Sequence, residues 1–211
     1  SEKLSEKFPE IELDILEIAP KEAIDLLYGR QLSVAVLAED SIAKSILSFS
    51  KTNLFEDPYV LAVPKSVSLE NIKSLEDLKN SPIRKALSNI IQFEFGNQHK
   101  KRIEEWFTSV LPNSKVFAKT RTYEVALSMV QSGRGVAVIP ALAARLSGNL
   151  DFDVNLYRTN LPVRKIVSLI PSQYIRVEPY KSFIETLSDS GKNIKLPKIH
   201  KVPPILESLS L

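Results

Sequence analysis

The stretch from Thr122 to Pro140, TYEVALSMVQSGRGVAVIP, decides the fold, because it holds a helix, a tight turn and a buried strand in succession. Thr122 is typical of a helix N-cap, with Glu124 in the favourable first turn. Four apolar residues recur at helical spacing and should face inward: Val125, Ala126, Met129 and Val130. Gly133 is expected to end the helix, and the apolar run at residues 136–139 predicts a buried strand. Pro140 then suits the start of a second helix over residues 141–146.

The preceding segment has a similar order. Residues 90–95 predict a strand, Gly96 a turn, and Asn97 the N-cap of a helix that stops near Pro112. Residues 116–119 predict the next strand. The helix between them should bury its apolar side chains at i, i+3, i+4 and i+7: Ile103, Trp106, Phe107 and Val110. Alternating strands and helices of this kind predict an α/β fold.

An earlier segment shows a third strand–helix–strand pattern. Residues 11–15 alternate apolar and polar side chains, and residues 16–18 extend the run. Pro20 favours the first position of a helix, which Gly29 should end in the left-handed conformation. Residues 32–37 predict a strand buried on both faces of a parallel sheet, so that the whole forms a right-handed βαβ unit.

Later segments determine the number of lobes. Residues 59–63 predict a strand ended by Pro64, and residues 75–79 predict a short helix. Residues 163–170 predict a late strand, followed by a helix that starts at Glu178-Pro179 and has Gly191 beyond its end. A return of this strand to the first sheet would give two α/β lobes joined by two connections; periodicity leaves that return open.

Composition limits the classes of function. Lys and Arg number 28 against 25 Asp and Glu, and the net charge of +3 is too small to indicate nucleic-acid binding through a bulk electrostatic field. The chain has no cysteine, which excludes disulfides and thiolate metal sites. No apolar run in the sequence has the length of a membrane span. Prolines at 197, 203 and 204 among lysines predict an extended C-terminal arm.

Catalytic motifs are not found. The segment Ser132-Gly-Arg-Gly135 lacks the central serine of a nucleophile elbow, and no glycine-rich phosphate loop follows a strand. His99 and His200 are far apart in sequence, and neither has a second ligand at metal spacing. We therefore predict no enzyme activity, no metal site and no cofactor.

Four segments, taken in order, carry a family resemblance. They are KFPEIEL from Lys7, YGRQLSVAV from Tyr28, EDPYVLAVP from Glu56 and SGRGVAVIP from Ser132. Their sequence and spacing resemble the ligand-sensing, C-terminal domain of LysR-type bacterial transcription regulators, over almost the whole chain up to about residue 190. The resemblance implies a cytoplasmic regulator.

This resemblance implies a type-2 periplasmic-binding-protein fold: two Rossmann-like lobes joined by two crossover strands, with a ligand cleft between them. Lobe I would comprise residues 1–64 and 163–190, lobe II residues 65–162, and residues 191–211 an extended tail. Family members also carry an N-terminal winged helix-turn-helix and a strand before the helix expected from Ser1 to Lys7. Neither is found in this sequence, so we expect a longer protein.

The expected ligand site follows from the fold. In open α/β sheets, ligands lie at the carboxyl ends of strands, where helix N-termini favour anions. We predict a small organic acid, or a similar metabolite, bound by Ala19, Pro20, Leu37, Ala38, Gly96, Asn97, Gln98, Thr120 and Thr122. A purely capping role for Asn97 and Thr122 is an equal alternative. Lys119 and Arg121 could pair with an acidic ligand, although a solvated edge position is the favoured interpretation.

The resemblance also implies partners, and two other classes of function stay open. Family habit implies a homodimer or tetramer through the helix from Ser1 to Lys7 and the helix from Gln98 to Val110, and DNA binding only through the missing N-terminal domain. An extracytoplasmic solute-binding protein of the same fold is the second hypothesis. A small transferase or dehydratase on that fold is the third. The full-length gene would separate the first two, because only a regulator carries the helix-turn-helix.

Overall fold

The structure is a computed structural model that describes residues 2–42, 48–79, 81, 83–94, 97–146 and 150–207 of the 211-residue chain. It divides into two compact units: unit 1 is Ser1–Glu56 with Arg164–Lys195, and unit 2 is Asp57–Val163 with Leu196–Leu211. The chain therefore passes between the units after residues 56, 163 and 195. Residues 57–64 belong to unit 2, whereas the resemblance placed them in lobe I.

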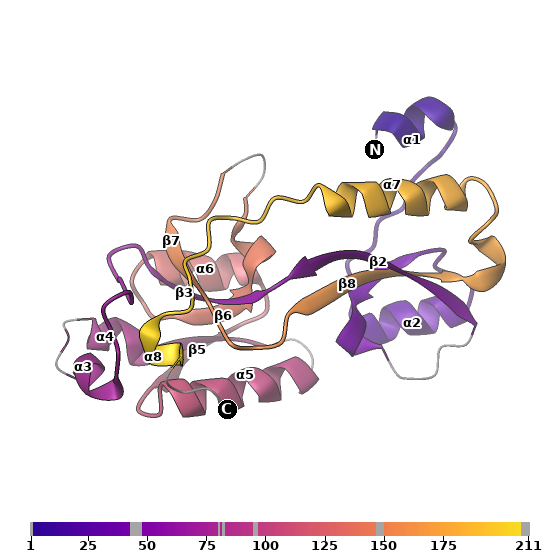
Figure 1. Ribbon diagram of the computed structural model, residues 1–211. Coiled ribbons are helices and arrows are strands. Elements are labelled where there is room, and N and C mark those ends of the chain that lie inside the picture. Colours follow the sequence, from indigo (N-terminus) through magenta and orange to yellow (C-terminus); the bar gives the residue numbers. More distant parts are fainter. Residues whose placement is uncertain are drawn as a thin grey trace. The chain divides into compact units, whose positions relative to one another are not determined.

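Unit 1 is built on a three-stranded sheet of order β1-β8-β2 (Figure 1). Its strands are β1 (Ala35–Ala38), β2 (Phe49–Asp57) and β8 (Arg164–Pro171). Leu37 of β1 lies opposite Val167 of β8 in an antiparallel pair. The late strand thus returns to the first sheet. The helices of unit 1 are α1 (Glu2–Lys7), α2 (Pro20–Tyr28), α7 (Tyr180–Lys192) and the 3₁₀ turns η1 (Glu39–Ser41) and η3 (Ser172–Tyr174).

The predicted first βαβ unit is wrong. Residues 11–18 form no strand, and β1 is antiparallel to β8 with Val36 half exposed. Leu13, Leu16 and residues 31–34 instead line a groove of about 380 Å³. Alternating side chains make a strand only when a neighbouring strand satisfies the backbone, and the described residues supply none beside residues 11–18. Ile15 is accordingly 85% exposed.

Two glycines in unit 1 have other roles than predicted. Gly29 follows α2 with a right-handed φ of −72°, and the left-handed residue is Arg30, with φ 58°. Gly191 lies inside α7, not beyond it. A Cβ at Gly191 would lie 2.5 Å from the backbone oxygen of Leu54 in β2, so this glycine permits close packing of α7 on the sheet.

Unit 2 is centred on β3 (Tyr59–Pro64), whose six residues are all buried. It pairs antiparallel with β6 (Ala137–Pro140) and β7 (Val154–Arg158). β4 (Asn89–Phe93) and β5 (Lys115–Thr120) pair in parallel, as the predicted strand–helix–strand order requires. An Ile90–Val136 bridge connects β4 to the segment before β6. The helices are α3 (Leu75–Lys79), α4 (Arg84–Leu87), α5 (Asn97–Val110), α6 (Tyr123–Gln131), η2 (Ala141–Ala144) and α8 (Pro204–Glu207).

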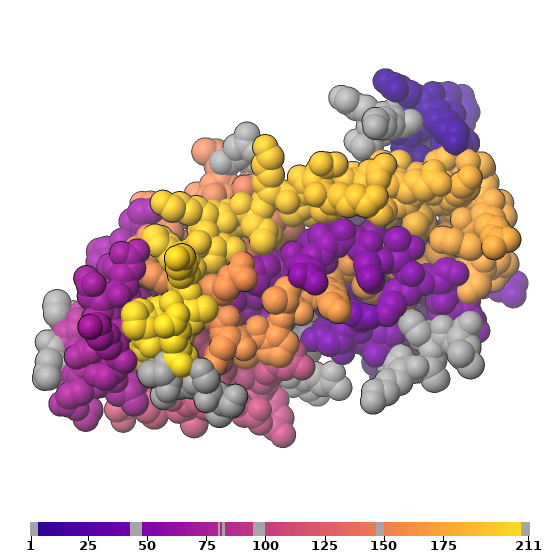
Figure 2. Space-filling view, viewed as in Figure 1, coloured from indigo at the N-terminus to yellow at the C-terminus, as the bar shows by residue number. Residues whose placement is uncertain are grey.

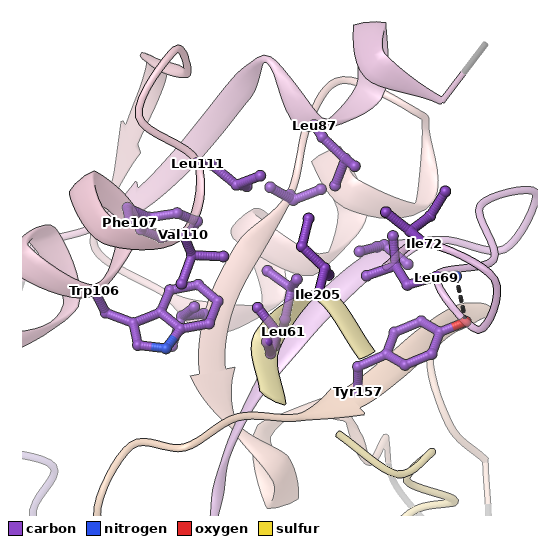
Figure 3. Close-up of a cluster of buried hydrophobic side chains, with 14 of the residues drawn as sticks. Leu61, Leu69, Ile72, Leu87, Trp106, Phe107, Val110, Leu111, Tyr157 and Ile205 are labelled. Carbon is purple, nitrogen blue, oxygen red and sulfur yellow. Dashed lines mark hydrogen bonds between the residues drawn. The ribbon is translucent and has the colours of Figure 1, made fainter. Parts of the chain in front are cut away.

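Alternate residues of β3 enter two apolar clusters, one on each face of the unit 2 sheet. The α5 cluster contains Leu61 of β3 and buries Trp106, Phe107 and Val110, while Ile103 is partly buried against it (Figure 3). The α6 cluster contains Val60 and Ala62 of β3 with Ala126, Leu127 and Val130. The helix periodicity thus predicted the buried face of α5, and that of α6 in part.

Details of the opening stretch need two corrections. Val125 is 50% exposed, and the adjacent Leu127 is the fully buried residue. Residues 141–144 form the 3₁₀ turn η2 instead of a longer helix. Gly133, with φ 73°, follows α6 in the left-handed region, as predicted.

Candidate ligand-binding site

The predicted ligand residues fall into two sets, one in each unit. In unit 1, Ala19 is the extended N-cap residue of α2 and Pro20 its first residue. The side chain of Ala19 makes no capping hydrogen bond, and its carbonyl oxygen accepts from the Ala23 N–H at 2.9 Å. This helix start can offer backbone N–H groups to an anion.

Leu37 and Ala38 end β1, the strand that leads into η1. Leu37 is 7% exposed, and its side chain belongs to the apolar core of unit 1 with Leu27 and Val167. Ala38 is partly exposed and is the N-cap residue of η1. Leu37 can therefore contact a ligand only through its backbone, whereas Ala38 can also offer its methyl group.

In unit 2, Thr120 and Thr122 lie between β5 and α6. Thr122 Oγ1 accepts a hydrogen bond from the Val125 N–H at 3.4 Å, which gives the predicted N-cap. Thr120 is 8% exposed, and its hydroxyl donates to the Thr122 carbonyl oxygen at 3.2 Å. Asn97 and Gln98 begin α5. Gly96 and the side chains of Asn97 and Gln98 lie outside the described part of the chain.

A charged group that the sequence did not single out lies beside these threonines. The carboxylate of Glu94 pairs with Lys100 Nζ of α5 at 3.2 Å and with Lys119 Nζ of β5 at 3.2 Å. The Glu94 N–H donates to the Thr120 carbonyl oxygen at 2.7 Å. Lys119 first and Lys100 second hold the pKa of Glu94 below its usual range, because both donate to the ionised carboxylate. Two ammonium groups thus share the Glu94 carboxylate, and Lys100 Nζ also lies 4.0 Å from Glu104 Oε1.

An aromatic pair lies at the same end of β4. The rings of Phe93 and Tyr123 stack with centroids 3.9 Å apart and planes 18° from parallel. Both side chains are partly exposed, so this end of unit 2 combines an apolar face, hydroxyl groups and two lysines. Glu94 lies one residue before the end of the predicted strand 90–95, and Tyr123 directly follows the predicted helix N-cap Thr122, which was the available signal. Their grouping depends on the parallel register of β4 and β5, which the sequence does not specify.

Within the described ranges, no group of three or more His, Asp and Glu residues has an arrangement that could hold a metal ion. No helix in those ranges has the length and apolar character to span a membrane.

Comparison with known proteins identifies the family. The sequence model of the LysR substrate binding domain matches residues 2–192. No curated protein matches the chain by sequence. Several solved structures share the fold at low identity. The reduced OxyR regulatory domain from Pseudomonas aeruginosa is 20% identical, with a TM-score of 0.62 over 92% of this chain and 88% of its own.

Two further structures are similar. The Synechocystis PCC6803 CcmR regulatory domain, in complex with 2-PG, is 13% identical, with a TM-score of 0.67 over 92% of this chain and 89% of its own. The BenM effector binding domain, with its effector benzoate, is 17% identical, with a TM-score of 0.63 over 93% of this chain and 86% of its own. The periplasmic-binding-protein-like fold and the ligand-sensing regulatory role predicted from sequence are therefore confirmed. The chain belongs to the LysR substrate binding domain family, the effector-sensing part of LysR-type transcription regulators.

Proposed function

We propose that this domain senses a small organic anion and, through the N-terminal DNA-binding domain of the full-length cytoplasmic regulator, changes transcription. The observation that carries the proposal is the pair of lysines around Glu94. Lys100 and Lys119 both lie 3.2 Å from one carboxylate, so their ammonium groups already form a binding geometry for a carboxylate.

The surroundings of the lysines favour an anion with an apolar body. Phe93 and Tyr123 offer a stacked aromatic surface, and Thr122 presents an exposed hydroxyl at the start of α6. The N-terminus of that helix adds a positive dipole end. An incoming carboxylate would compete with Glu94 for the lysines, which makes binding dependent on the charge of Glu94.

The remaining predicted residues are proposed as ligand contacts, each within its own unit. In unit 2, we propose that Gly96, Asn97, Gln98 and Thr120 contact the ligand with Thr122. In unit 1, we propose backbone contacts from Ala19, Pro20, Leu37 and Ala38. Support comes from the chemistry of helix starts and strand ends. The similar BenM domain is described with benzoate, an aromatic carboxylate, as its effector.

We further propose that two copies pair through α1 and α5. The inner face of α5 is buried in its own unit, but its outer face exposes Lys101, Glu105 and Thr108. Neighbouring β5 exposes Val116 and Phe117 to 48% and 49%. Exposed aliphatic and aromatic side chains beside a polar helix face are typical of a subunit interface.

The anion proposal is tested by calorimetric titration and thermal shift with benzoate and with benzamide, its uncharged analogue. We expect benzoate alone to bind and to raise the melting temperature by mass action. Lys100→Ala and Lys119→Ala should abolish that effect. Lys101→Ala, which removes a lysine paired with Glu105 at 3.7 Å on the outer face of α5, is the matched control. Equal effects of benzoate and benzamide, or full binding in both lysine variants, would contradict the proposal.

A further inference from the structure

The chain continues past the end of the family match at residue 192, and the structure describes this continuation up to residue 207. Residues 196–207, called the C-terminal strap below, belong to unit 2 although they directly follow a helix and linker of unit 1. In Figure 2 the strap, in yellow, lies on the surface beside purple segments that precede residue 80.

The strap adds to the edge of the unit 2 sheet. The His200 N–H donates to the Leu156 carbonyl oxygen at 2.8 Å, and the Arg158 N–H donates to the His200 carbonyl oxygen at 3.1 Å. Together they form a parallel bridge between His200 and Tyr157 of β7. Because β7 ends the order β6-β3-β7, the strap covers an otherwise open strand edge.

Side-chain contacts of His200 hold the middle of the strap in place. The imidazole of His200 stacks on the Tyr157 ring, with centroids 4.9 Å apart, and its Nδ1 lies 3.3 Å from Glu70 Oε1. The Tyr157 hydroxyl oxygen in turn accepts the Leu69 N–H at 3.0 Å. These contacts of His200 and Tyr157 therefore join the strap, β7 and the loop after β3.

The strap contacts both apolar clusters of unit 2. Leu196 and Ile199 pack on the α6 cluster. Ile205 and Leu206, 3% and 2% exposed, are buried in the α5 cluster, where Figure 3 shows Ile205 among Leu61, Leu69 and Ile72. The Ile205 N–H also donates to the Ile72 carbonyl oxygen at 2.9 Å. The strap thus passes around the β7 edge from one face of the sheet to the other.

A side-chain hydrogen bond also connects α5 to the segment after β7. Trp106 Nε1 of α5 donates to Asn160 Oδ1 at 2.7 Å, and Asn160 lies two residues after β7 ends. Ile205 thus lies in the same buried cluster as α5, and Asn160 accepts a hydrogen bond from Trp106 of that helix. His200 is bridged to β7, the strand that Asn160 follows, and Ile205 lies five residues after His200.

We propose that the C-terminal strap is a clamp that fixes α5 on the unit 2 sheet, so that its release loosens α5 and weakens the pairing of two chains through that helix. The expected weakening of pairing rests on the proposed dimer, whereas the fixing of α5 by the strap does not. Release would withdraw Ile205 and Leu206 from the α5 cluster and free the edge of β7 at once, because one short segment makes both contacts.

The experiment compares the full chain with Ile205→Ala/Leu206→Ala and with the milder His200→Ala, using Lys201→Ala as a control on an exposed strap residue. Amide hydrogen exchange is followed in α5, with α2 of unit 1 as the internal reference, and sedimentation equilibrium gives the association constant. We expect exchange in α5 to rise roughly tenfold or more in the double variant and less in His200→Ala. The exchange rate of α2 should stay constant, and association should weaken in the same order.

Three results would count against the proposal. Unchanged α5 exchange in both variants would overturn the clamp, as would an equal rise in α2 and α5 in His200→Ala, which would indicate general destabilisation. Loosened α5 with unchanged association would overturn the link to pairing. A chain that is monomeric in every variant would instead refute the proposed dimer, and exchange in α5 would still decide the clamp.

Discussion

The backbone N–H of Leu69 donates a 3.0 Å hydrogen bond to the phenolic oxygen of Tyr157, at a buried position where the tyrosine is only 1% exposed. This bond joins the loop after β3 to β7. Tyr157→Phe keeps the ring and its stacking on His200 but leaves the Leu69 N–H without its acceptor. We expect a loss of about 1–3 kcal/mol in the free energy of unfolding, measured by urea denaturation. Asn113→Ala, at an exposed turn residue, should change it by less than about 0.5 kcal/mol.

Close packing at Gly191 gives a second prediction. A methyl group there would lie 2.5 Å from the Leu54 backbone oxygen, so Gly191→Ala should force α7 away from β2 and cost about 1–3 kcal/mol of unfolding free energy. Gly29→Ala is the matched control, because its φ is −72° and the added Cβ would meet its nearest neighbour at 3.4 Å. Equal stability of the two alanine variants in thermal melts would show that α7 does not pack this closely.

Gly191 also shows where sequence reasoning reached its limit. A glycine near the end of an apolar helical stripe has the same appearance whether it ends the helix or packs against a strand, and the choice depends on β2, which periodicity did not reveal. The buried face of α5 was predictable because the spacing of its apolar residues determines which side of the helix is apolar, whereas in α6 the same reasoning placed the exposed Val125 inward and missed the buried Leu127. The strand at residues 11–18 was not, because a strand also needs a partner.

The residues of the candidate site also differ in whether the sequence could predict their roles. Thr122 was predictable as a cap, since the capping hydroxyl acts on the backbone three residues later. The lysines around Glu94 come from α5 and β5, and the register of the β4–β5 pairing, which the sequence does not specify, brings them together. A contact between residues close in sequence, such as the Thr122 cap, could therefore be predicted, whereas a cluster of side chains from neighbouring strands could not.

The Glu178 carboxylate predicts a dependence of stability on pH in unit 1. Its oxygens accept hydrogen bonds from the Ser182 N–H and from Lys7 Nζ, at 3.3 and 3.1 Å. Ser182 first, then Lys7, lower the pKa of Glu178 in the folded chain. A carboxyl group with a depressed folded pKa contributes stability above its unfolded pKa of about 4.3, and the contribution is lost as pH falls through the folded value.

Glu178→Gln should therefore be less stable than the natural chain at pH 7, and the difference should shrink toward pH 3. Urea denaturation at both pH values measures it. Glu10→Gln, at a carboxylate of the exposed N-terminal segment, is the control. A difference that is constant between pH 7 and pH 3 would mean that the ionised carboxylate is not the stabilising species.

The outer face of α5 gives the last prediction. Lys101 and Glu105 form an exposed i, i+4 pair, and Thr108 continues the same face one turn later. If two chains pair through this helix, Thr108→Arg should place a bulky charged side chain in the interface and raise the dimer dissociation constant roughly tenfold or more. The fold should be unaffected, because Thr108 is exposed, whereas Trp106 and Phe107 form the buried face. Sedimentation equilibrium measures the constant, and Arg84→Ala, on the short helix α4 of the same unit, should leave it unchanged. The opposite ranking of these two variants would place the interface on another face of unit 2.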